Sequence, residues 1–581
     1  MRALRWLYLL LIAPQALWAI NNSVPYVRQG LSYSSPDWLN GYGAIAGVLE
    51  VQGTEGNGID GFAGHAHDAI AGRTDIFGYS YGFQDVKDFK DNDPTDNNFH
   101  GTFVAGIMAS QYNTFTGVAP YAKYYGAVFD GSDGKAPFLS LNSSLNYLVS
   151  QGAQTINNSW GNTPTSASQL TGSYFPESLL MDEYTGYRGK TGGTTATYNN
   201  RLMVIAAGNA GEESGLLGGP ADSFNSLVVG ALASGSTPGS TWNDPARVPV
   251  AQVATYSSWR PLADGRNGVH VVAPGSDLWS TLAINYFNTN GYVAGTASGT
   301  SFAAPHVTGV ATLLYGAPAQ PLWSGTTYKG TVLSTDHKLI KAIIINSADK
   351  IAGLDSNGVA QTSWLPGWTT QQDGVTTALA PLNYAVGAGS VNAANAFLTY
   401  AEASNRFWTL STLTTAGQTD YYTLGEGKFT SANPDQTELF GLTATLVWDR
   451  HVDFSVNTDP ANPEAGSIDK DLLSQLELYL QRQISPGLWT NVYISAAVPS
   501  SLQHIYMPML PTNGIYRLAV HATTLVEPSL GEEYALAVEF IMVPEPGGWF
   551  LIITGLAVLR ASRRRSRKYT RSALAAAGVQ A

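Results

Sequence analysis

The sequence predicts an α/β unit, with a parallel sheet and helices on both faces, followed by an antiparallel β-sandwich. In residues 44–399, short apolar runs alternate with helical patterns, as is typical of parallel sheets. From about residue 400, apolar residues recur at every second position, and turn residues separate these runs, which favours a jelly-roll-like sandwich over residues 400–541. The 61 glycines and the low charged fraction of 13% suit a chain with many turns and strands.

The composition excludes several functional classes. The 581 residues are 44% hydrophobic, so the chain can bury a large core. A formal net charge of −12 disfavours nucleic acid as a partner. The sequence contains no cysteine, which excludes disulfides, a cysteine nucleophile and thiolate metal sites.

Residues 1–19 have the layout of a secretory signal peptide. Two arginines precede an apolar run, and the segment ends in the sequence ALWA, so we expect cleavage after Ala19 and export of the protein. Residues 20–43 are polar and aromatic and contain Pro25, Pro36 and several serines and asparagines. They are expected to form a lead-in segment before the α/β unit.

The apolar run at 44–51 predicts a buried strand that ends in a loop. Glu50 lies near the C-terminal end of this strand, the edge at which α/β sheets carry functional groups. Asp60 is the alternative acid, but no apolar strand precedes it. The strand pattern favours Glu50, although an acid that only caps the strand would give the same pattern.

Two further residues occupy positions from which a side chain can act. His100 begins a predicted helix of small and apolar residues, although a lone histidine at such a place is more often structural. Asn209 follows the buried strand at 202–206, where a turn asparagine is the ordinary interpretation.

Ser301 lies in the sequence GTSFAAP at 299–305, which enters a predicted buried helix. The N–H groups and the dipole of a helix N-terminus favour negative charge, which suits a nucleophile. Pro305 lies early in this helix, where its missing N–H costs little. For an isolated serine, a helix N-cap would be the expected role.

Taken together, these motifs resemble those of the subtilases, the subtilisin-like serine proteases. The sequence GTSFAAP is similar to the family's serine motif, HGTFVAG at 100–106 to its histidine motif, and GNAG at 208–211 to its oxyanion motif. Along the chain the acid Glu50 comes first, then His100 and then Ser301, and this order of acid, histidine and serine is also found in subtilisin. The resemblance covers about residues 44–399.

The resemblance implies a serine endopeptidase that acts on proteins or peptides through an acyl-enzyme, with no required cofactor. Glu50, His100 and Ser301 would be catalytic, and Asn209 would be an oxyanion donor. One wall of the pocket for the residue before the scissile bond would come from three consecutive residues: Ser159, Trp160 and Gly161.

The chain departs from the family pattern in several ways. Glu50 stands where the family has aspartate, Phe99 where glycine is usual, and Phe103 where a second histidine is usual. The segment 20–43 is also too short for a folding prodomain. These departures leave a second hypothesis, a catalytically degenerate surface protein that acts in binding or adhesion. The intact motifs around His100, Asn209 and Ser301 argue for activity.

Residues 542–581 are expected to form a sorting tail. The sequence VPEPGG at 543–548 leads into an apolar run at 549–559 and then an arginine cluster. The run is shorter than the ~20 residues of a comfortable spanning helix, but the basic cluster would stay in the cytoplasm. This order resembles the PEP-CTERM signal of Gram-negative bacteria, which implies an exported or surface-associated protein held transiently in a membrane. An ordinary membrane anchor is the alternative.

Calcium is a possible structural ion. Five aspartates crowd the loop before the histidine motif: Asp85, Asp88, Asp91, Asp93 and Asp96. Carboxylate oxygens are the ligands that Ca²⁺ prefers, but a solvated acidic loop, partly neutralised by Lys87 and Lys90, is the favoured interpretation. His65 and His67 lack metal partners at helical spacing and are expected to be loop residues.

Overall fold

A computed structural model describes most of the chain between residues 23 and 542. The described residues are 23–28, 39–52, 70–75, 78–89, 100–112, 115–130, 137–162, 164, 166, 174–186, 200–234, 249–281, 295–319, 334–402, 405–424, 440–456, 466–510 and 515–542.

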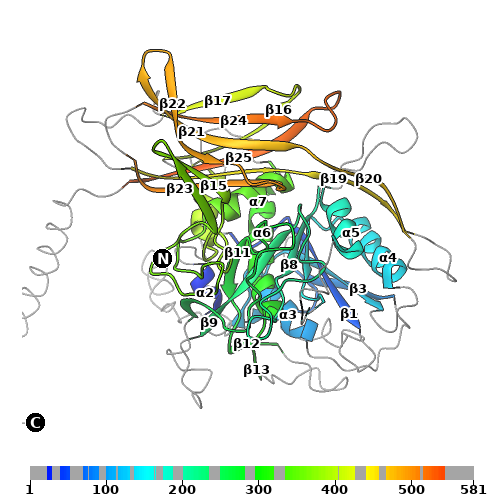
Figure 1. Cartoon of the computed structure of the whole chain (residues 1–581). Helices are drawn as coiled ribbons and strands as arrows, with labels where there is room; N and C mark the ends of the chain where they lie inside the picture. Colours follow the sequence, from blue (N-terminus) through cyan, green and yellow to red (C-terminus); the bar gives the residue numbers. More distant parts are fainter. Residues whose placement is uncertain are drawn as a thin grey trace, which may run out of the picture.

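The larger unit is built on a nine-stranded sheet with the order β10-β9-β8-β7-β1-β6-β3-β2, and β11 pairs with β9 (Figure 1). Its strands are β1 (Ile45–Gln52), β2 (Arg73–Thr74), β3 (Ser80–Asp88), β6 (Lys123–Asp130), β7 (Thr155–Asn158), β8 (Leu202–Ala206), β9 (Leu227–Ser234), β10 (Pro249–Val253) and β11 (Val271–Pro274). The inner pairs are parallel, and only the edge strands β2 and β10 pair antiparallel. This is the predicted α/β sheet.

Helices cover both faces of this sheet. They are α2 (Ser23–Val27), α3 (His100–Ala109), α4 (Pro137–Ser150), α5 (Pro176–Thr185), α6 (Thr300–Gly316), α7 (His337–Asn346) and α8 (Ala393–Tyr400), with a 3-10 turn at Ala317–Ala319. Successive strand side chains point to opposite faces. Val204 of β8 accordingly joins the core shared with α3, α6 and α7, whereas Met203 and Ile205 join the core shared with α4 and α5.

Part of the predicted lead-in segment belongs to the main core. Helix α2 buries Val24 and Val27 there. The guanidinium of the following Arg28 is also buried, and it donates hydrogen bonds to the carbonyls of Leu39 and Val118 at 2.8 and 2.7 Å. This segment therefore packs as an element of the α/β unit.

The C-terminal region forms two facing sheets, with the orders β14-β15-β22-β21-β24-β17 and β16-β25-β18-β23. Their strands are β14 (Trp368–Gln372), β15 (Val375–Ala380), β16 (Arg406–Leu413), β17 (Thr419–Leu424), β18 (Phe440–Trp448), β21 (Gln475–Ser485), β22 (Leu488–Ser495), β23 (Leu502–Leu510), β24 (Tyr516–Thr524) and β25 (Glu532–Met542). Leu446 and Leu536 from one sheet share a core with Leu478 and Leu518 from the other. This is the predicted sandwich.

Three short two-stranded ribbons complete the fold. They are β4 (Gln111–Tyr112) with β5 (Phe115–Thr116), β12 (Leu278–Ser280) with β13 (Gly295–Ala297), and β19 (Arg450–Ser455) with β20 (Ser467–Leu473).

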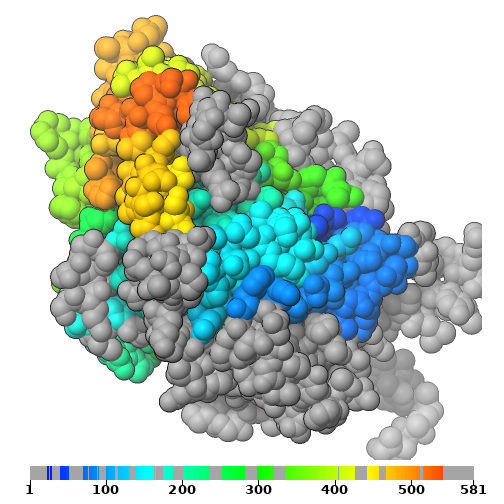
Figure 2. Space-filling model, turned by 90° about the vertical axis from the view of Figure 1, so that its right-hand side faces the viewer, coloured from blue at the N-terminus to red at the C-terminus, as the bar shows by residue number. Residues whose placement is uncertain are grey.

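The two units interlock. The hairpin β14–β15 lies within the range predicted for the α/β unit, yet β15 pairs with β22 of the sandwich. Helix α7 lies against β18 and β25, and the β19–β20 ribbon reaches from the sandwich to α5 (Figure 1). Figure 2 shows this ribbon, in yellow, against the cyan surface of the α/β unit. Strand pairing and packing therefore cross the predicted boundary near residue 400.

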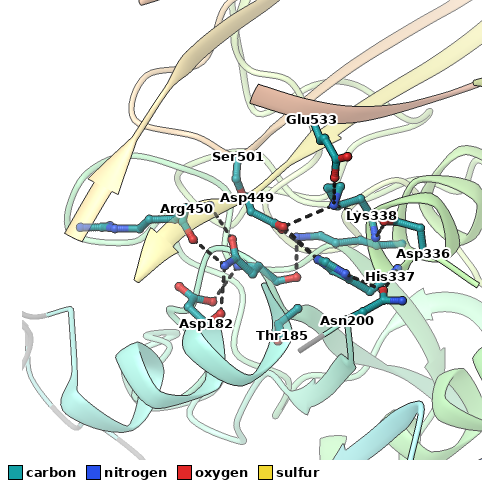
Figure 3. Close-up of polar contacts among 12 residues, drawn as sticks. Asp182, Thr185, Asn200, Asp336, His337, Lys338, Asp449, Arg450, Ser501 and Glu533 are labelled. Carbon is teal, nitrogen blue, oxygen red and sulfur yellow. Dashed lines mark hydrogen bonds and ion pairs between the residues drawn. The ribbon is translucent and has the colours of Figure 1, made fainter. Parts of the chain in front are cut away.

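A cluster of buried polar groups lies where the units meet (Figure 3). Asp449, between β18 and β19, accepts hydrogen bonds from Nε2 of His337 at 3.0 and 3.1 Å. Its carboxylate also lies 3.6 Å from the Lys338 ammonium. Asn225 pairs with the backbone of Arg450 through both ends of its amide, at 2.7 and 2.9 Å. These contacts fasten the sandwich to α7 and to the end of the central sheet.

No helix in the described part of the chain is long and apolar enough to cross a membrane. The predicted signal peptide and the predicted transmembrane run at 549–559 lie outside the described residues, so both stay predictions.

Candidate active site

The predicted site residues meet at one edge of the central sheet. Strands β8, β7 and β1 are neighbours, and they end near Asn209, Ser159 and Glu50 respectively. Because parallel strands present their carboxyl ends at the same edge, these side chains come together. His100 and Ser301 join them from the first turns of α3 and α6.

A pocket of about 250 Å³ opens at this edge. Its lining includes all seven residues that the sequence singled out: Glu50, His100, Ser159, Trp160, Gly161, Asn209 and Ser301.

Glu50 and His100 form a direct pair, with 3.0 Å between Glu50 Oε2 and His100 Nδ1. The Glu50 side chain is 3% exposed and that of His100 is 25% exposed. Burial works against a charged imidazole, but the attraction and hydrogen bond of Glu50 outweigh it and raise the pKa of His100. An ionised carboxylate can only accept a hydrogen bond, so Nδ1 donates and the lone pair of neutral His100 is on Nε2.

An aromatic ring lies beside the imidazole, and a second ring packs on the first. The ring of Phe302 lies 5.2 Å from that of His100, and Phe103 packs on Phe302 at 4.6 Å. Phe103 is one of the predicted departures from the family motif, and its ring supports the histidine indirectly. Asp60, the alternative acid, lies outside the described residues.

Asn209 is held by the residue that precedes the serine. The backbone N–H and the hydroxyl of Thr300 both approach Asn209 Oδ1, at 2.9 and 3.0 Å. Nδ2 is therefore the end of the amide that can donate to a bound group. Gly208 before it has a φ of 99°, a conformation that side chains disfavour, and its N–H donates to the Thr300 hydroxyl at 3.1 Å.

Ser301 lies in the first turn of α6, where the backbone N–H groups have no helical partner. Ser301 lines the pocket together with Asn209 and His100. Its own carbonyl accepts a hydrogen bond from the Ser159 hydroxyl at 2.6 Å. The helix N-terminus thus supplies a backbone N–H beside the serine that can stabilise negative charge.

The sequence analysis did not assign several small residues to the pocket. Its lining also includes Ala206, Ala207, Gly208, Gly218 and Ala221. The glycine-rich stretch after Asn209 was the available signal, but the sequence of such a loop does not indicate which part of the fold it packs against. Trp160 packs edge-on against Phe129, with 4.7 Å between ring centroids, and so belongs to both the pocket and the core.

No group of three or more potential metal ligands occurs within the described ranges. Asp85 accepts a hydrogen bond from the Tyr147 hydroxyl at 2.7 Å. Asp91, Asp93 and Asp96 lie outside those ranges, as do His65 and His67. The calcium site therefore stays a prediction.

Part of this chain is similar in sequence to known proteins. Over 256 residues the chain is 30% identical to pyrolysin from Pyrococcus furiosus, covering 42% of this chain and 16% of pyrolysin. Over 243 residues it is 29% identical to alkaline elastase YaB from a Bacillus species, covering 42% of this chain and 50% of that protein. It therefore spans half or less of these two relatives.

A third relative is matched over most of its length. The chain is 30% identical over 271 residues to thermitase from Thermoactinomyces vulgaris, covering 46% of this chain and 74% of thermitase. The model of the subtilase family matches residues 32–389, which is more than half of the chain. The chain therefore belongs to the subtilase family.

Proposed function

We propose that this protein is a serine endopeptidase that hydrolyses peptide bonds through an acyl-enzyme. The observation that carries the proposal is the 3.0 Å contact of Glu50 with His100 in the pocket that Ser301 and Asn209 also line. Membership of the subtilase family and the similarity to thermitase support it.

In the proposed mechanism, the Ser301 hydroxyl attacks the carbonyl carbon of the substrate, and Nε2 of His100 accepts its proton. Glu50 holds the ring so that Nε2 faces the pocket, and its charge stabilises the imidazolium. The negative oxygen that forms accepts hydrogen bonds from Asn209 Nδ2 and from the Ser301 backbone N–H.

The second half of the reaction uses the same groups. His100 returns the proton to the leaving amine, which leaves Ser301 acylated. It then takes a proton from water as the water attacks the ester, and returns it to Ser301 Oγ when the acid is released. Each proton removed is thus given back, and no cofactor is needed.

We also propose that the enzyme acts on proteins or peptides outside the cytoplasm. The signal-peptide layout of residues 1–19 and the acidic net charge support export. The tail at 542–581 supports transient membrane retention by a PEP-CTERM-type signal. Fractionation of a Gram-negative host that expresses the full chain, with and without the tail, would test this location.

Labelling with a fluorophosphonate probe, followed by peptide mass mapping, tests the activity. We expect modification at Ser301, hydrolysis of casein by the wild-type protein, and loss of both in Ser301→Ala. A folded wild-type protein that neither reacts with the probe nor cleaves casein would contradict the proposal and favour the degenerate binding protein.

A further inference from the structure

Three buried side chains with uncharged polar groups connect the end of β7 to α6. Asn157 and Thr308 are fully buried, and Ser159 is nearly so. Uncharged polar groups between a sheet and a helix are costly unless they are hydrogen-bonded. Their contacts with one another therefore indicate what holds them in this place.

The three side chains form a directed chain of hydrogen bonds. Thr308 Oγ1 lies 3.0 Å from Asn157 Oδ1 and 3.1 Å from the carbonyl of Ala304. Asn157 Nδ2 donates to Ser159 Oγ at 2.8 Å. Since an amide NH₂ can only donate, Ser159 accepts this bond, and its single proton goes to the carbonyl of Ser301 at 2.6 Å.

The carbonyl of Ser301 needs such a donor because of Pro305. In an α-helix the carbonyl of residue i accepts a hydrogen bond from the N–H of residue i+4. For Ser301 that residue is Pro305, which lies inside α6 and has no N–H. The proline therefore removes the helical donor, and Ser159 supplies a donor from the sheet instead.

We propose that Ser159, oriented by Asn157 and Thr308, is a positioning residue for the nucleophile. Its hydrogen bond fixes the peptide plane that follows Ser301, and so limits rotation of a residue that lines the pocket. This role rests on the proposed function of Ser301. Displacement of a reacting group by about 1 Å can slow an enzyme by about 10²-fold.

Removal of the donor provides the first test. In Ser159→Ala we expect kcat for a peptide p-nitroanilide to fall on the order of tenfold, with KM unchanged within about twofold. Labelling by the fluorophosphonate should slow in parallel. Ser144→Ala is the matched control, because Ser144 is fully buried in α4 and its hydroxyl donates to the carbonyl of Val128 at 3.3 Å, outside the pocket. It should leave kcat unchanged.

A double variant separates positioning from general stability. Pro305→Ala restores an N–H at position 305 that can donate to the Ser301 carbonyl. In that background, Ser159→Ala should lower kcat by no more than about threefold, because the two donors substitute for one another. If Ser159→Ala lowers kcat as much in the Pro305→Ala background as in the wild-type protein, the proposal is overturned.

Ser159→Thr keeps the hydroxyl and tests the same role without changing the helix. We expect kcat to stay within about threefold of wild type. A Ser159→Ala protein with wild-type kcat would refute the positioning role while leaving the proposed function intact. A wild-type protein that is folded but unreactive would instead refute the proposed function, and the positioning role with it.

Discussion

Two histidine–carboxylate pairs in this protein have the same contact distance and very different surroundings. Glu50 with His100 and Asp449 with His337 are each joined at 3.0 Å. A quarter of the His100 side chain is exposed, and it lines the pocket. The His337 side chain is only 2% exposed, and it lies at the contact between the α/β unit and the sandwich (Figure 3).

Both ring nitrogens of His337 lie against oxygen atoms of other side chains. Nδ1 lies 3.0 Å from Asn200 Oδ1, and Nε2 faces Asp449. In His100, Nδ1 faces the carboxylate of Glu50, so the lone pair of the neutral ring is on Nε2. The two pairs thus differ in exposure and in access to the pocket, and not in the contact distance.

Replacing the exposed histidine should have the largest effect on activity. For His100→Ala we expect kcat to fall by about 10⁴-fold or more, because no other group takes the proton from Ser301. The thermal midpoint should change little. His521→Ala, in the sandwich, serves as control. A fall in kcat of less than about tenfold at unchanged KM would show that His100 is not the catalytic base.

The carboxylate of the same pair should show its role in the pH profile. Glu50→Gln should lower kcat by about 10³- to 10⁴-fold, since the amide can stabilise the wrong tautomer. Glu50 raises the pKa of His100. Its loss lowers that pKa, so the acid limb of kcat/KM should move to lower pH. An acid limb that stays in place would argue that Glu50 does not contact His100 in the working enzyme.

Breaking the buried pair should change stability instead. Asp449→Ala leaves His337 buried without its carboxylate, whereas Lys338 keeps Asp336 at 3.3 Å and Glu533 at 3.6 Å. We therefore expect a loss of about 3 kcal/mol in the free energy of unfolding, the lower end of the range for breaking a buried pair. Activity per folded molecule should be preserved. Urea denaturation gives the stability, and active-site titration with the fluorophosphonate gives the folded fraction. A stable Asp449→Ala protein would show that the apolar contacts alone hold the units together.

The stability carried by Asp449 should also depend on pH. Burial opposes its ionisation, but His337 and Lys338 outweigh this and lower the pKa of Asp449. A carboxyl whose pKa is lower in the folded protein stabilises it fully above the unfolded pKa of about 4 and loses this contribution as pH falls. The stability difference between wild type and Asp449→Asn should therefore shrink below about pH 4.

The pocket amide should affect activity less than the histidine–carboxylate pair does. For Asn209→Ala we expect kcat to fall by about 10²- to 10³-fold, with little change in KM, because Nδ2 would bind the oxyanion mainly in the transition state. Steady-state kinetics on a peptide p-nitroanilide checks this. A rise in KM at constant kcat would assign Asn209 to substrate binding instead.

Local sequence patterns were sufficient for most elements of the fold. Helix α6 and strand β8, for example, follow from apolar runs of the right length next to glycine, serine or asparagine. The hairpin β14–β15 could not be assigned in this way. Its strand Trp368–Gln372 is exposed along its whole length, so no hydrophobic period indicated which sheet it would join.

Some residues of the candidate site could likewise be predicted from local sequence, and others could not. His100, Asn209 and Ser301 could be predicted because each lies at the end of an element, and the end of a helix or a parallel strand has a defined direction. Asn157 and Thr308 could not, because a polar residue inside an apolar run carries no local sign of its partner.

Sequence patterns thus specified which elements form and which side chains stand at their ends. Tertiary packing specified the partners: Glu50 for His100, Ser159 for the Ser301 carbonyl, and Asp449 for His337, which lie 50, 142 and 112 residues apart. The physical reason is that periodicity and capping depend on neighbours within a few turns, whereas these contacts depend on how whole strands and helices pack. The burial of each pair and its hydrogen bonds then determine its chemical environment.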